Sequence, residues 1–224
     1  MSQFVTGTSN GGLTAHPGGD RWRWESRLFG GAYDDAAPEE RPVYGSLDHA
    51  RRAVGGSPRF GSAFFRLRPE VLVRTTFCWP DSVFEPTDLG VAQAMRLVRL
   101  LEEAADVDPL DRYVEAHVHG PVRLADDVEA LVLDPSHRGT DVETAAGALG
   151  CPVEWHPGFR LTVDLLQQHA GYRGPEAVAL GERLAVDGVL TPRVLGEAVG
   201  PVDPQHLKWL WHCLARFGAA DRPA

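Results

Sequence analysis

Residues 112–119 place acidic and imidazole side chains in strict alternation with apolar ones. Glu115, His117 and His119 occupy every second position, and valine or alanine fills the positions between them. An alternation with a period of two is typical of a β-strand, whose successive side chains point to opposite faces. The segment therefore predicts a strand that presents one carboxylate and two imidazoles in a row.

Three kinds of site are compatible with this row of polar side chains. In a catalytic site, the Glu115 carboxylate would stabilise a developing positive charge or act as a base, and His117 would orient the substrate. In a metal site, His117 and His119 would supply two nitrogen ligands, for zinc in particular. Glu115 or a remote Asp could add a carboxylate, and His137 or His16 could be a further ligand. The third interpretation is an edge strand whose polar face lies in water.

A glycine-rich segment near the N-terminus is a second candidate for chemistry. Residues 6–12 read Thr-Gly-Thr-Ser-Asn-Gly-Gly. The hydroxyls and backbone N–H groups around Thr8, Ser9 and Asn10 could curl around an anion. The segment matches neither a Walker loop nor the Gly-x-Gly-x-x-Gly fingerprint of dinucleotide-binding folds. It therefore indicates a binding loop without specifying the ligand.

Arginine and tryptophan alternate shortly afterwards, in Arg21-Trp-Arg-Trp-Glu-Ser-Arg27. Arg21 and Arg23 would suit the phosphates of a nucleotide, and the tryptophans would stack on a flat ring. The alternative is a strand with tryptophan in the core and arginine in water. Together with the glycine-rich segment, this pattern favours a nucleotide or another small molecule as the substrate.

The composition indicates a folded protein with an acidic surface. The 224 residues are 43% hydrophobic and carry a formal net charge of -9, which suits one main domain with a small appendage and argues against sequence-blind binding to nucleic acid. The three cysteines are widely spaced, so they form neither a disulfide framework nor a zinc knuckle. No apolar run is long enough to span a bilayer, and we expect a cytoplasmic protein without a membrane partner.

Hydrophobic periodicity divides the chain into a sheet-forming first part and a helical second part. In the first part, strands are predicted at residues 61–68, 69–77, 112–119 and 128–133, helices at 46–54 and 89–105, and a strand end at 1–6. In the second part, helices are predicted at residues 142–149, 162–169, 175–187, 191–199 and 204–217, and a short strand at 153–155. We therefore expect an α+β fold. A mixed or antiparallel sheet in residues 1–138 would carry the site, and a mostly helical C-terminal region in residues 139–224 would pack on it.

Four runs of sequence carry a family resemblance. They are Gly7-Thr-Ser-Asn-Gly-Gly-Leu-Thr14, the segment from Arg23 to Asp34, Glu40-Arg-Pro-Val-Tyr-Gly45 and Tyr113-Val-Glu-Ala-His-Val-His-Gly120. In these runs the chain resembles an uncharacterised bacterial family, a conserved domain of unknown function. The resemblance extends from the N-terminus into the region of Asp134 and beyond.

A more remote resemblance lies in the order of several segments. Before the Tyr-Val-Glu-Ala strand come Arg41-Pro-Val-Tyr-Gly45, Phe60-Gly-Ser62, Pro69-Glu-Val71, Arg74-Thr-Thr-Phe77 and Pro80-Asp-Ser82. This order is similar to that in mono-ADP-ribosyltransferase toxins and their phage head-associated relatives. In that superfamily an Arg or His on a first strand holds NAD, a strand rich in Ser and Thr braces the pocket, and a late-strand Glu stabilises the oxocarbenium ion of the ribose.

The resemblance implies an ADP-ribosyltransferase-like sheet with NAD as the substrate. Thr6 to Ser9 would form the bracing strand, and Glu115 would be the late glutamate. Tyr113 stands where these enzymes commonly have Gln or Glu, and His117 would take the supporting place.

Three functions follow as expectations. The first is an NAD-dependent mono-ADP-ribosyltransferase or NAD glycohydrolase, in which Arg21 or Arg23 holds the pyrophosphate and a protein is a possible acceptor. The second is a metal-dependent hydrolase or zinc-binding protein that uses the two histidines of the strand. The third is a binding module without chemistry, in which the helix at residues 204–217 docks a partner through Trp209 and Trp211.

Overall fold

The chain folds into two compact units. The computed structural model describes residues 2–7 and 14–220. Unit 1 comprises residues 1–50 and 67–128, and unit 2 comprises residues 51–66 and 129–224. This division differs from the expected boundary after residue 138, because the second unit also takes in residues 51–66 and begins its longer segment at residue 129.

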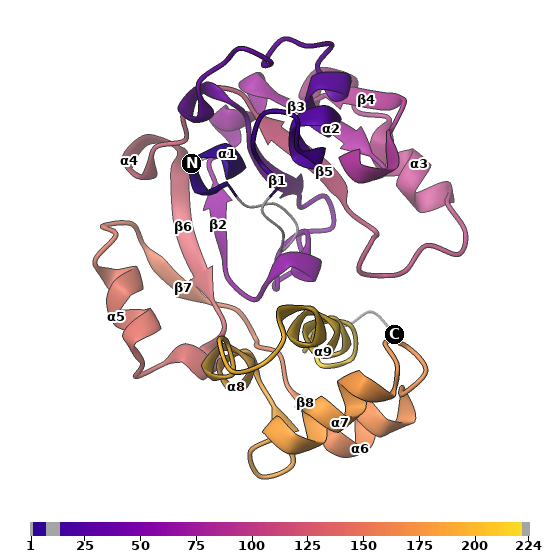
Figure 1. Cartoon of the computed structure of the whole chain (residues 1–224). Coiled ribbons are helices and arrows are strands. Elements are labelled where there is room, and N and C mark those ends of the chain that lie inside the picture. The colour runs from indigo at the N-terminus through magenta and orange to yellow at the C-terminus, as the bar shows by residue number, and fades with distance from the viewer. Residues whose placement is uncertain (1, 8–13, 221–224) are drawn as a thin grey trace. The chain divides into compact units, whose positions relative to one another are not determined.

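Unit 1 is built around a four-stranded sheet (Figure 1). Its strands are β1 (Val43–Leu47), β3 (Thr75–Trp79), β4 (Asp88–Val91) and β5 (Val114–Val118). Their order in the sheet is β1-β5-β3-β4, and each neighbouring pair is antiparallel. The predicted strand at residues 112–119 is therefore confirmed, and so is the α+β fold class. The edge-strand interpretation of this segment is wrong, because β5 lies between β1 and β3.

Two helices of unit 1 correct the prediction from sequence. The helices of this unit are α1 (Gln3–Thr6), α2 (Asp20–Leu28), α3 (Leu97–Glu103) and α4 (Leu124–Asp127). Residues 3–6 form a helical turn where we expected a strand end. The alternating Arg and Trp residues lie in α2, on which Arg21 and Glu25 are buried. Residues four apart share one face of a helix. The segment therefore follows the spacing of Arg21 and Glu25 and not the alternation of Arg and Trp.

Of the two helices predicted in this part of the chain, one is shortened and the other is wrong. The predicted helix at residues 89–105 begins as β4, continues through a 3-10 turn at Ala92–Ala94, and becomes helical only in α3. The predicted helix at residues 46–54 does not form, because its first residues pair with β5 as the end of β1. In both cases, pairing in the sheet takes residues that a local pattern assigned to a helix.

The apolar core of unit 1 lies on one face of the sheet. Phe77, Val114 and Ala116 point to this face and pack against Leu97 and Leu101 of α3. Because side chains alternate along a strand, the residues between those of β5 point to the opposite face. That opposite face carries the polar row.

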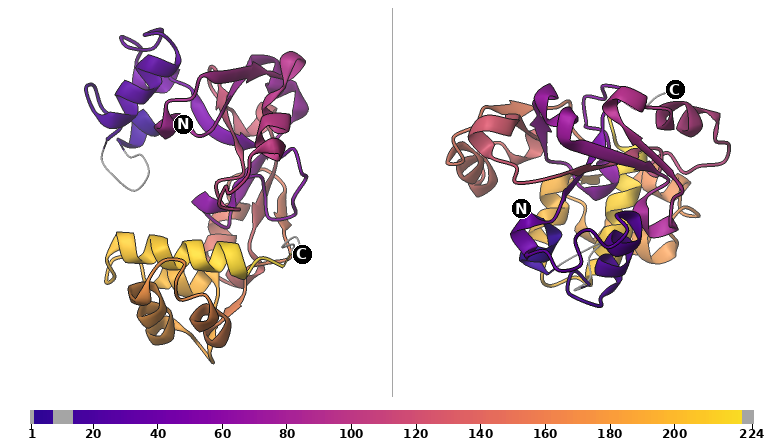
Figure 2. Two further views of the ribbon diagram at one scale, coloured as in Figure 1. Left: turned by 90° about the vertical axis from the view of Figure 1, so that its right-hand side faces the viewer. Right: turned by 90° about the horizontal axis from the view of Figure 1, so that it is seen from above.

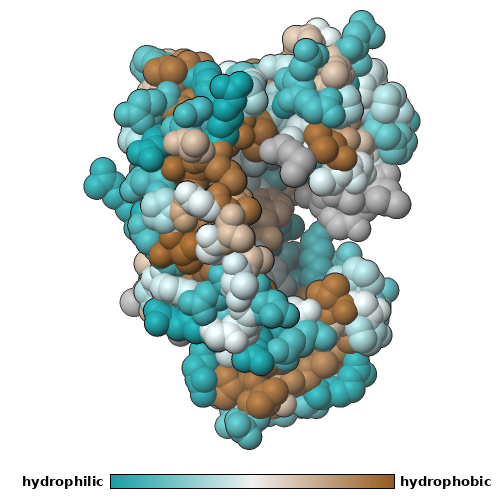
Figure 3. All heavy atoms as spheres, turned by 90° about the vertical axis from the view of Figure 1, so that its left-hand side faces the viewer, coloured by the Kyte–Doolittle hydropathy of each residue, from teal (hydrophilic) through white to brown (hydrophobic). Residues whose placement is uncertain are grey.

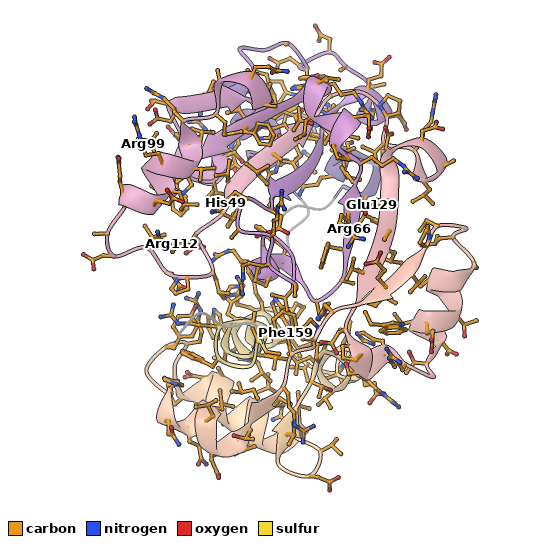
Figure 4. The ribbon with its side chains drawn as sticks, turned by 180° about the vertical axis from the view of Figure 1, so that it is seen from behind. His49, Arg66, Arg99, Arg112, Glu129 and Phe159 are labelled. Atoms are coloured by element: carbon orange, nitrogen blue, oxygen red, sulfur yellow. The ribbon has the colours of Figure 1, made fainter. Side chains whose placement is uncertain are left out.

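Unit 2 contains a three-stranded sheet in the order β2-β6-β7, except for the terminal strand residues Leu67 and Val128, which belong to unit 1. The strands are β2 (Phe64–Leu67), β6 (Val128–Leu133) and β7 (Val153–Trp155), and β6 and β7 are parallel. Helix α5 (Asp141–Gly147) covers it through Ala146, which clusters with Leu131 and Leu133. Figure 4 shows the Arg66 and Glu129 side chains beside one another on β2 and β6, where Arg66 Nε lies 3.3 Å from a Glu129 carboxylate oxygen.

The remainder of unit 2 is helical, as predicted. Its helices are α6 (Val163–Gln168), α7 (Pro175–Leu184), α8 (Pro192–Glu197) and α9 (Pro204–Phe217), and β8 (Leu161–Thr162) pairs with β9 (Val189–Leu190). Proline occupies the first turn of three of these helices, where it loses no hydrogen bond. Helix α9 packs along α6 and α7 (Figure 2). Trp211 of α9 donates to the backbone carbonyl oxygens of Pro58 and Arg59 within the same unit.

On the face drawn in Figure 3, apolar patches lie among polar residues. Among the exposed large apolar side chains of the described residues are those of Val73, Phe84 and Phe60. Isolated apolar residues of this kind are common on soluble domains. Within the part of the chain that the structure describes, every helix is too short or too polar to cross a lipid bilayer.

Gly181 in α7 is a position where unit 2 has no room for a side chain. A Cβ atom there would collide with Leu166 and would lie 3.1 Å from Leu210 Cδ1. We expect Gly181→Ala to lower the free energy of unfolding by about 1–3 kcal/mol, because the helices would have to separate. The measurement is denaturant unfolding followed by circular dichroism.

Gly196→Ala in α8 is the matched control. Apart from its chain neighbours and the backbone of its own helix, no described atom lies within 4 Å of its added Cβ, and alanine favours helix over glycine by roughly 1 kcal/mol. The control should therefore be neutral or slightly stabilising. Equal destabilisation by the two substitutions would contradict the close packing of α7.

Candidate functional site

The polar face of the unit 1 sheet brings together side chains from three strands. Cys78 lies opposite Glu115 and Thr76 lies opposite His117 in the pairing of β3 with β5. Tyr44 lies opposite His117 on the other side, in β1. Directly opposite residues of antiparallel strands point to the same face. These five residues therefore form one cluster, which we call the site face.

The site face is buried beneath other parts of unit 1. Glu115 is 5% exposed and His117 is 0% exposed. The ring of Phe29, just after α2, meets His117 edge-on at 5.2 Å between ring centroids. Polar groups enclosed in this way need hydrogen-bond partners, and both residues have them.

The two oxygens of the Glu115 carboxylate have different partners. Oε1 lies 2.8 Å from His117 Nε2. Oε2 accepts from the Ser82 hydroxyl at 3.2 Å and from the Ser82 backbone N–H at 3.4 Å. The Ser82 hydroxyl in turn accepts from Arg21 Nη1 at 3.1 Å. Arg21, Ser82 and Glu115 thus form a buried hydrogen-bonded chain.

These contacts keep the Glu115 carboxylate charged. Burial raises its pKa, but the hydrogen bond and the charge of His117 lower it. The charge of Arg21 and the hydrogen bond from Ser82 act in the same direction, and the net pKa lies below the usual value for glutamate. Glu115 is therefore an ionised group inside the protein at neutral pH.

A chain of hydrogen bonds leads from Glu115 towards the surface. His117 Nδ1 lies 3.2 Å from the Thr76 hydroxyl, which lies 2.9 Å from His119 Nε2. His119 Nδ1 lies 2.7 Å from the hydroxyl of Tyr33, and both of these residues are half-buried. Each imidazole and hydroxyl can both donate and accept. Because the ionised Glu115 only accepts, His117 Nε2–H donates to it, and Thr76, His119 and Tyr33 extend the chain from His117 Nδ1 as a route that can carry a proton.

Burial also tunes the outer members of this chain. It raises the pKa of Tyr33, and the charge of Glu25 adds to that shift. Burial lowers the pKa of His119, and the nearby His117 lowers it further. Both shifts favour the neutral forms of Tyr33 and His119. A neutral group can take a proton from one neighbour and release one to the next, so that no charge remains on it.

An apolar pocket of about 340 Å³ adjoins the site face. Its lining residues are Leu28, Phe29, Thr76, Leu89, Gly90, Val91, Ala94 and His117. Small-molecule pockets typically combine such apolar walls with a few polar groups, and here Thr76 and His117 are the polar groups. Glu115 does not line the pocket and is joined to it through His117.

Cys78 is one of three members of the site face, with Tyr44 and Thr76, that the sequence did not lead us to select. Its Sγ lies 3.8 Å from both Glu115 Oε1 and His117 Nε2. Burial and the charge of Glu115 raise the pKa of the thiol well above its usual value, so it is protonated and a poor nucleophile in this environment. A partial signal did exist in the sequence, since Cys78 directly follows the predicted strand at residues 69–77 and lies two residues after Thr76, as His117 does after Glu115.

The histidines considered for a metal site do not all meet. His117 Nε2 points to Cys78 and Glu115, whereas His119 Nε2 points to Thr76. Within the described residues, the group of donor side chains close enough to share an ion consists of Cys78, Glu115 and His117. Neither His119 nor His16 belongs to it.

The residues predicted to bind a nucleotide are distributed differently. Arg21 is buried beside Ser82, whereas Arg23 lies on the exposed side of α2 and pairs with Asp20 at 3.2 Å. Thr8, Ser9 and Asn10 lie outside the residues that the structure describes. Ser82, which sequence reasoning did not select, is the hydroxyl that contacts the glutamate.

A second buried charge cluster holds α2 on the sheet. Arg41 Nη1 lies 2.6 Å from one oxygen of Glu25, and the Tyr44 hydroxyl donates to the other oxygen at 2.9 Å. Arg21 lies over the Tyr44 ring, with 4.6 Å between its Cζ and the ring centroid. Burial raises the pKa of Glu25, although Tyr44 and Arg41 counteract that shift. The cluster fixes the helix that delivers Arg21 to the site.

Fold and site together describe an α+β protein with a buried glutamate–histidine pair, in which the glutamate is ionised, beside an apolar pocket. The chain belongs to the family described as Protein of unknown function (DUF3626), which matches residues 1–108 and 96–217. The two matched segments include residues of both units, and the predicted membership of a family of unknown function is confirmed. No curated protein matches the sequence.

Proposed function

We propose that the chain cleaves the bond between nicotinamide and ribose in NAD, as an NAD glycohydrolase or a mono-ADP-ribosyltransferase. Breaking this bond develops positive charge on the ribose, as in glycoside hydrolysis. An ionised carboxylate in a low-dielectric interior stabilises such a charge. The observation that carries the proposal is the Glu115 carboxylate, which is buried yet kept ionised by Arg21, Ser82 and His117.

The residue types around Glu115 support this choice. The ADP-ribosyltransferases that the sequence resembles use an Arg, a Ser/Thr-rich strand and a late-strand Glu. Here Arg21, Ser82 and Glu115 are connected by hydrogen bonds, although they come from α2, a 3-10 turn at Ser82–Phe84 and β5. Ser82 thus takes the bracing role that the resemblance implied for Thr6 to Ser9.

The pocket beside the site face suits an uncharged flat ring. Phe29, Leu89 and Val91 form part of its apolar wall, and such walls favour an aromatic ring without charge. Nicotinamide has lost its positive charge once it leaves the ribose, so an apolar wall favours the leaving group over the substrate. His117 separates Glu115 from the pocket. The carboxylate would therefore stabilise the positive charge on the ribose electrostatically, across the imidazole ring of His117.

The hydrogen-bond chain supplies a route for the proton that the reaction releases. NAD and water give nicotinamide, ADP-ribose and one proton. The Thr76 hydroxyl lines the pocket, and His119 and Tyr33 continue the path from it to the half-exposed end. When a protein side chain replaces water as the acceptor, it loses a proton in the same way.

The test is incubation of the full chain with NAD that is labelled in its ADP-ribose part. Labelled free ADP-ribose would support hydrolysis, and label attached to a protein would support transfer. Recovery of all the label as intact NAD, at protein concentrations comparable to that of the nucleotide, would contradict both forms of the proposal.

A further inference from the structure

Cys78, Glu115 and His117 converge on one point of the site face. The thiol sulfur lies 3.8 Å from Glu115 Oε1 and 3.8 Å from His117 Nε2, and those two atoms are 2.8 Å apart. Donor atoms that share a tetrahedral ion at ~2.0–2.3 Å lie roughly 3–4 Å from one another. A small opening of the Glu115–His117 contact would therefore make room for an ion between all three donors.

The geometry points to a binding site for a zinc-class divalent cation, held by Cys78 Sγ, His117 Nε2 and Glu115 Oε1. The site differs from one built on His117 and His119, because one donor, Cys78, comes from the neighbouring strand β3. Three protein ligands leave a fourth position for water, as in zinc sites that are not closed.

The surrounding residues are arranged as they are around metal ligands. A histidine that binds a metal commonly donates its other ring N–H to a nearby acceptor, and His117 Nδ1 lies 3.2 Å from the Thr76 hydroxyl. A ligating carboxylate is likewise hydrogen-bonded, and Ser82 holds the Glu115 oxygen that faces away from the thiol. Both ligands are thus oriented without using the atoms that would contact the ion.

Charge and ligand type select the kind of ion. A thiolate, a carboxylate and a neutral imidazole together balance a charge of +2, which offsets the cost of burying the ion. Sulfur and nitrogen ligands favour zinc and similar transition metals over magnesium or calcium, which prefer oxygen. Arg21 is the nearby positive group, and it approaches the cluster through Ser82, on the side of Glu115 away from the thiol.

The ion would also switch off the activity proposed above, and this step rests on that proposal. It would occupy Glu115 Oε1 and His117 Nε2, so the carboxylate would no longer stabilise charge on the ribose. Zinc should therefore inhibit NAD cleavage, whereas the binding of the ion itself does not depend on NAD.

Cobalt titration of the full chain, freed of metal with a chelator, tests the site directly. We expect one Co²⁺ per chain and a thiolate-to-cobalt absorption band, which reports a sulfur ligand independently of any activity. The band should persist in the Cys151→Ser/Cys213→Ser double variant, in which Cys78 is the only remaining cysteine. Absence of the band from the unmodified chain or from this double variant would overturn the site.

Cys78→Ser and Cys213→Ser form the matched pair. Both thiols are buried, but Cys213 lies in α9 of unit 2. Cys78→Ser should abolish the band and Cys213→Ser should keep it, and a band that survives Cys78→Ser would refute the assignment. If Cys78→Ser does not fold, the double variant still decides the question.

Zinc inhibition is then measured, for each protein separately, as the rate of NAD cleavage with zinc divided by the rate without zinc. For the double variant, the rate at saturating zinc should be at least tenfold lower than the rate without zinc. Cobalt binding without inhibition would support the metal site and remove its regulatory role. Cobalt binding in a chain that does not cleave NAD at all would count against the proposed function and leave the metal site standing.

Discussion

Replacement of Glu115 by glutamine is expected to reduce the release of nicotinamide from NAD by about a hundredfold or more. The substitution keeps the shape of the side chain and removes its charge. A unit charge roughly 6 Å from a developing cation, at an effective dielectric constant of ~20, contributes about 3 kcal/mol, which is about a hundredfold in rate. NAD binding should change only a few-fold, because the ribose carries this charge only in the transition state.

Two measurements separate this effect from a loss of structure. Glu102→Gln removes an equivalent charge from an exposed position on α3 and should retain the rate of the unmodified chain. NAD affinity, measured by calorimetry on both variants, reports whether the pocket is intact. If Glu115→Gln binds NAD and releases nicotinamide at the original rate, the role assigned to Glu115 is wrong.

Replacement of Arg41 by alanine is expected to lower the free energy of unfolding by about 3–5 kcal/mol. The Arg41 side chain is 3% exposed and its partner Glu25 is 0% exposed. Removing one member of a buried ion pair leaves the other charge without compensation in the interior. Here the Tyr44 hydroxyl would remain as a hydrogen-bond partner of Glu25, but it cannot replace the lost positive charge.

Arg23→Ala is the control for this prediction, because Arg23 also pairs with a carboxylate and lies on the same helix as Glu25. The Arg23–Asp20 pair is solvent-exposed, with about 60% of each side chain accessible, and such pairs contribute about 0–1 kcal/mol. Denaturant unfolding of the two variants should therefore give clearly different midpoints. Similar midpoints would show that the Glu25–Arg41 contact is not the buried pair described.

Local sequence patterns predicted those parts of the fold that depend on neighbours along the chain. The alternation in residues 112–119 predicted β5 and the shared face of Glu115 and His117, because a strand fixes this relation by itself. The helices of residues 162–217 were predicted from their apolar spacing, and the helix at residues 191–199 also from its Thr-Pro start. In these segments the local preference and the final packing agree.

The same reasoning failed where tertiary contacts decide the structure. In residues 21–27 the alternation of Arg and Trp suggested a strand. The segment is a helix instead, and Arg21 and Glu25, four residues apart, lie on its buried face. A helix whose buried face carries an arginine and a glutamate cannot be recognised by apolar periodicity. Its polar residues are accommodated only because Arg41 and Ser82 meet them from distant segments.

Half of the candidate site was also beyond a single sequence. Cys78 reaches Glu115 because β3 pairs with β5 in one particular register, and a shift of one residue would turn Cys78 to the other face. Ser82 approaches from a turn that follows β3, for which no local pattern predicts a partner. The sequence therefore indicated the glutamate and the histidine, and the structure supplied the hydroxyl and the thiol.

The most direct test of the central claim is the rate of nicotinamide release from NAD by the purified, unmodified chain after treatment with a chelator. We expect release that is linear in time and proportional to protein concentration. A rate equal to that of NAD in buffer alone, in a preparation whose fold is verified by circular dichroism, would contradict it.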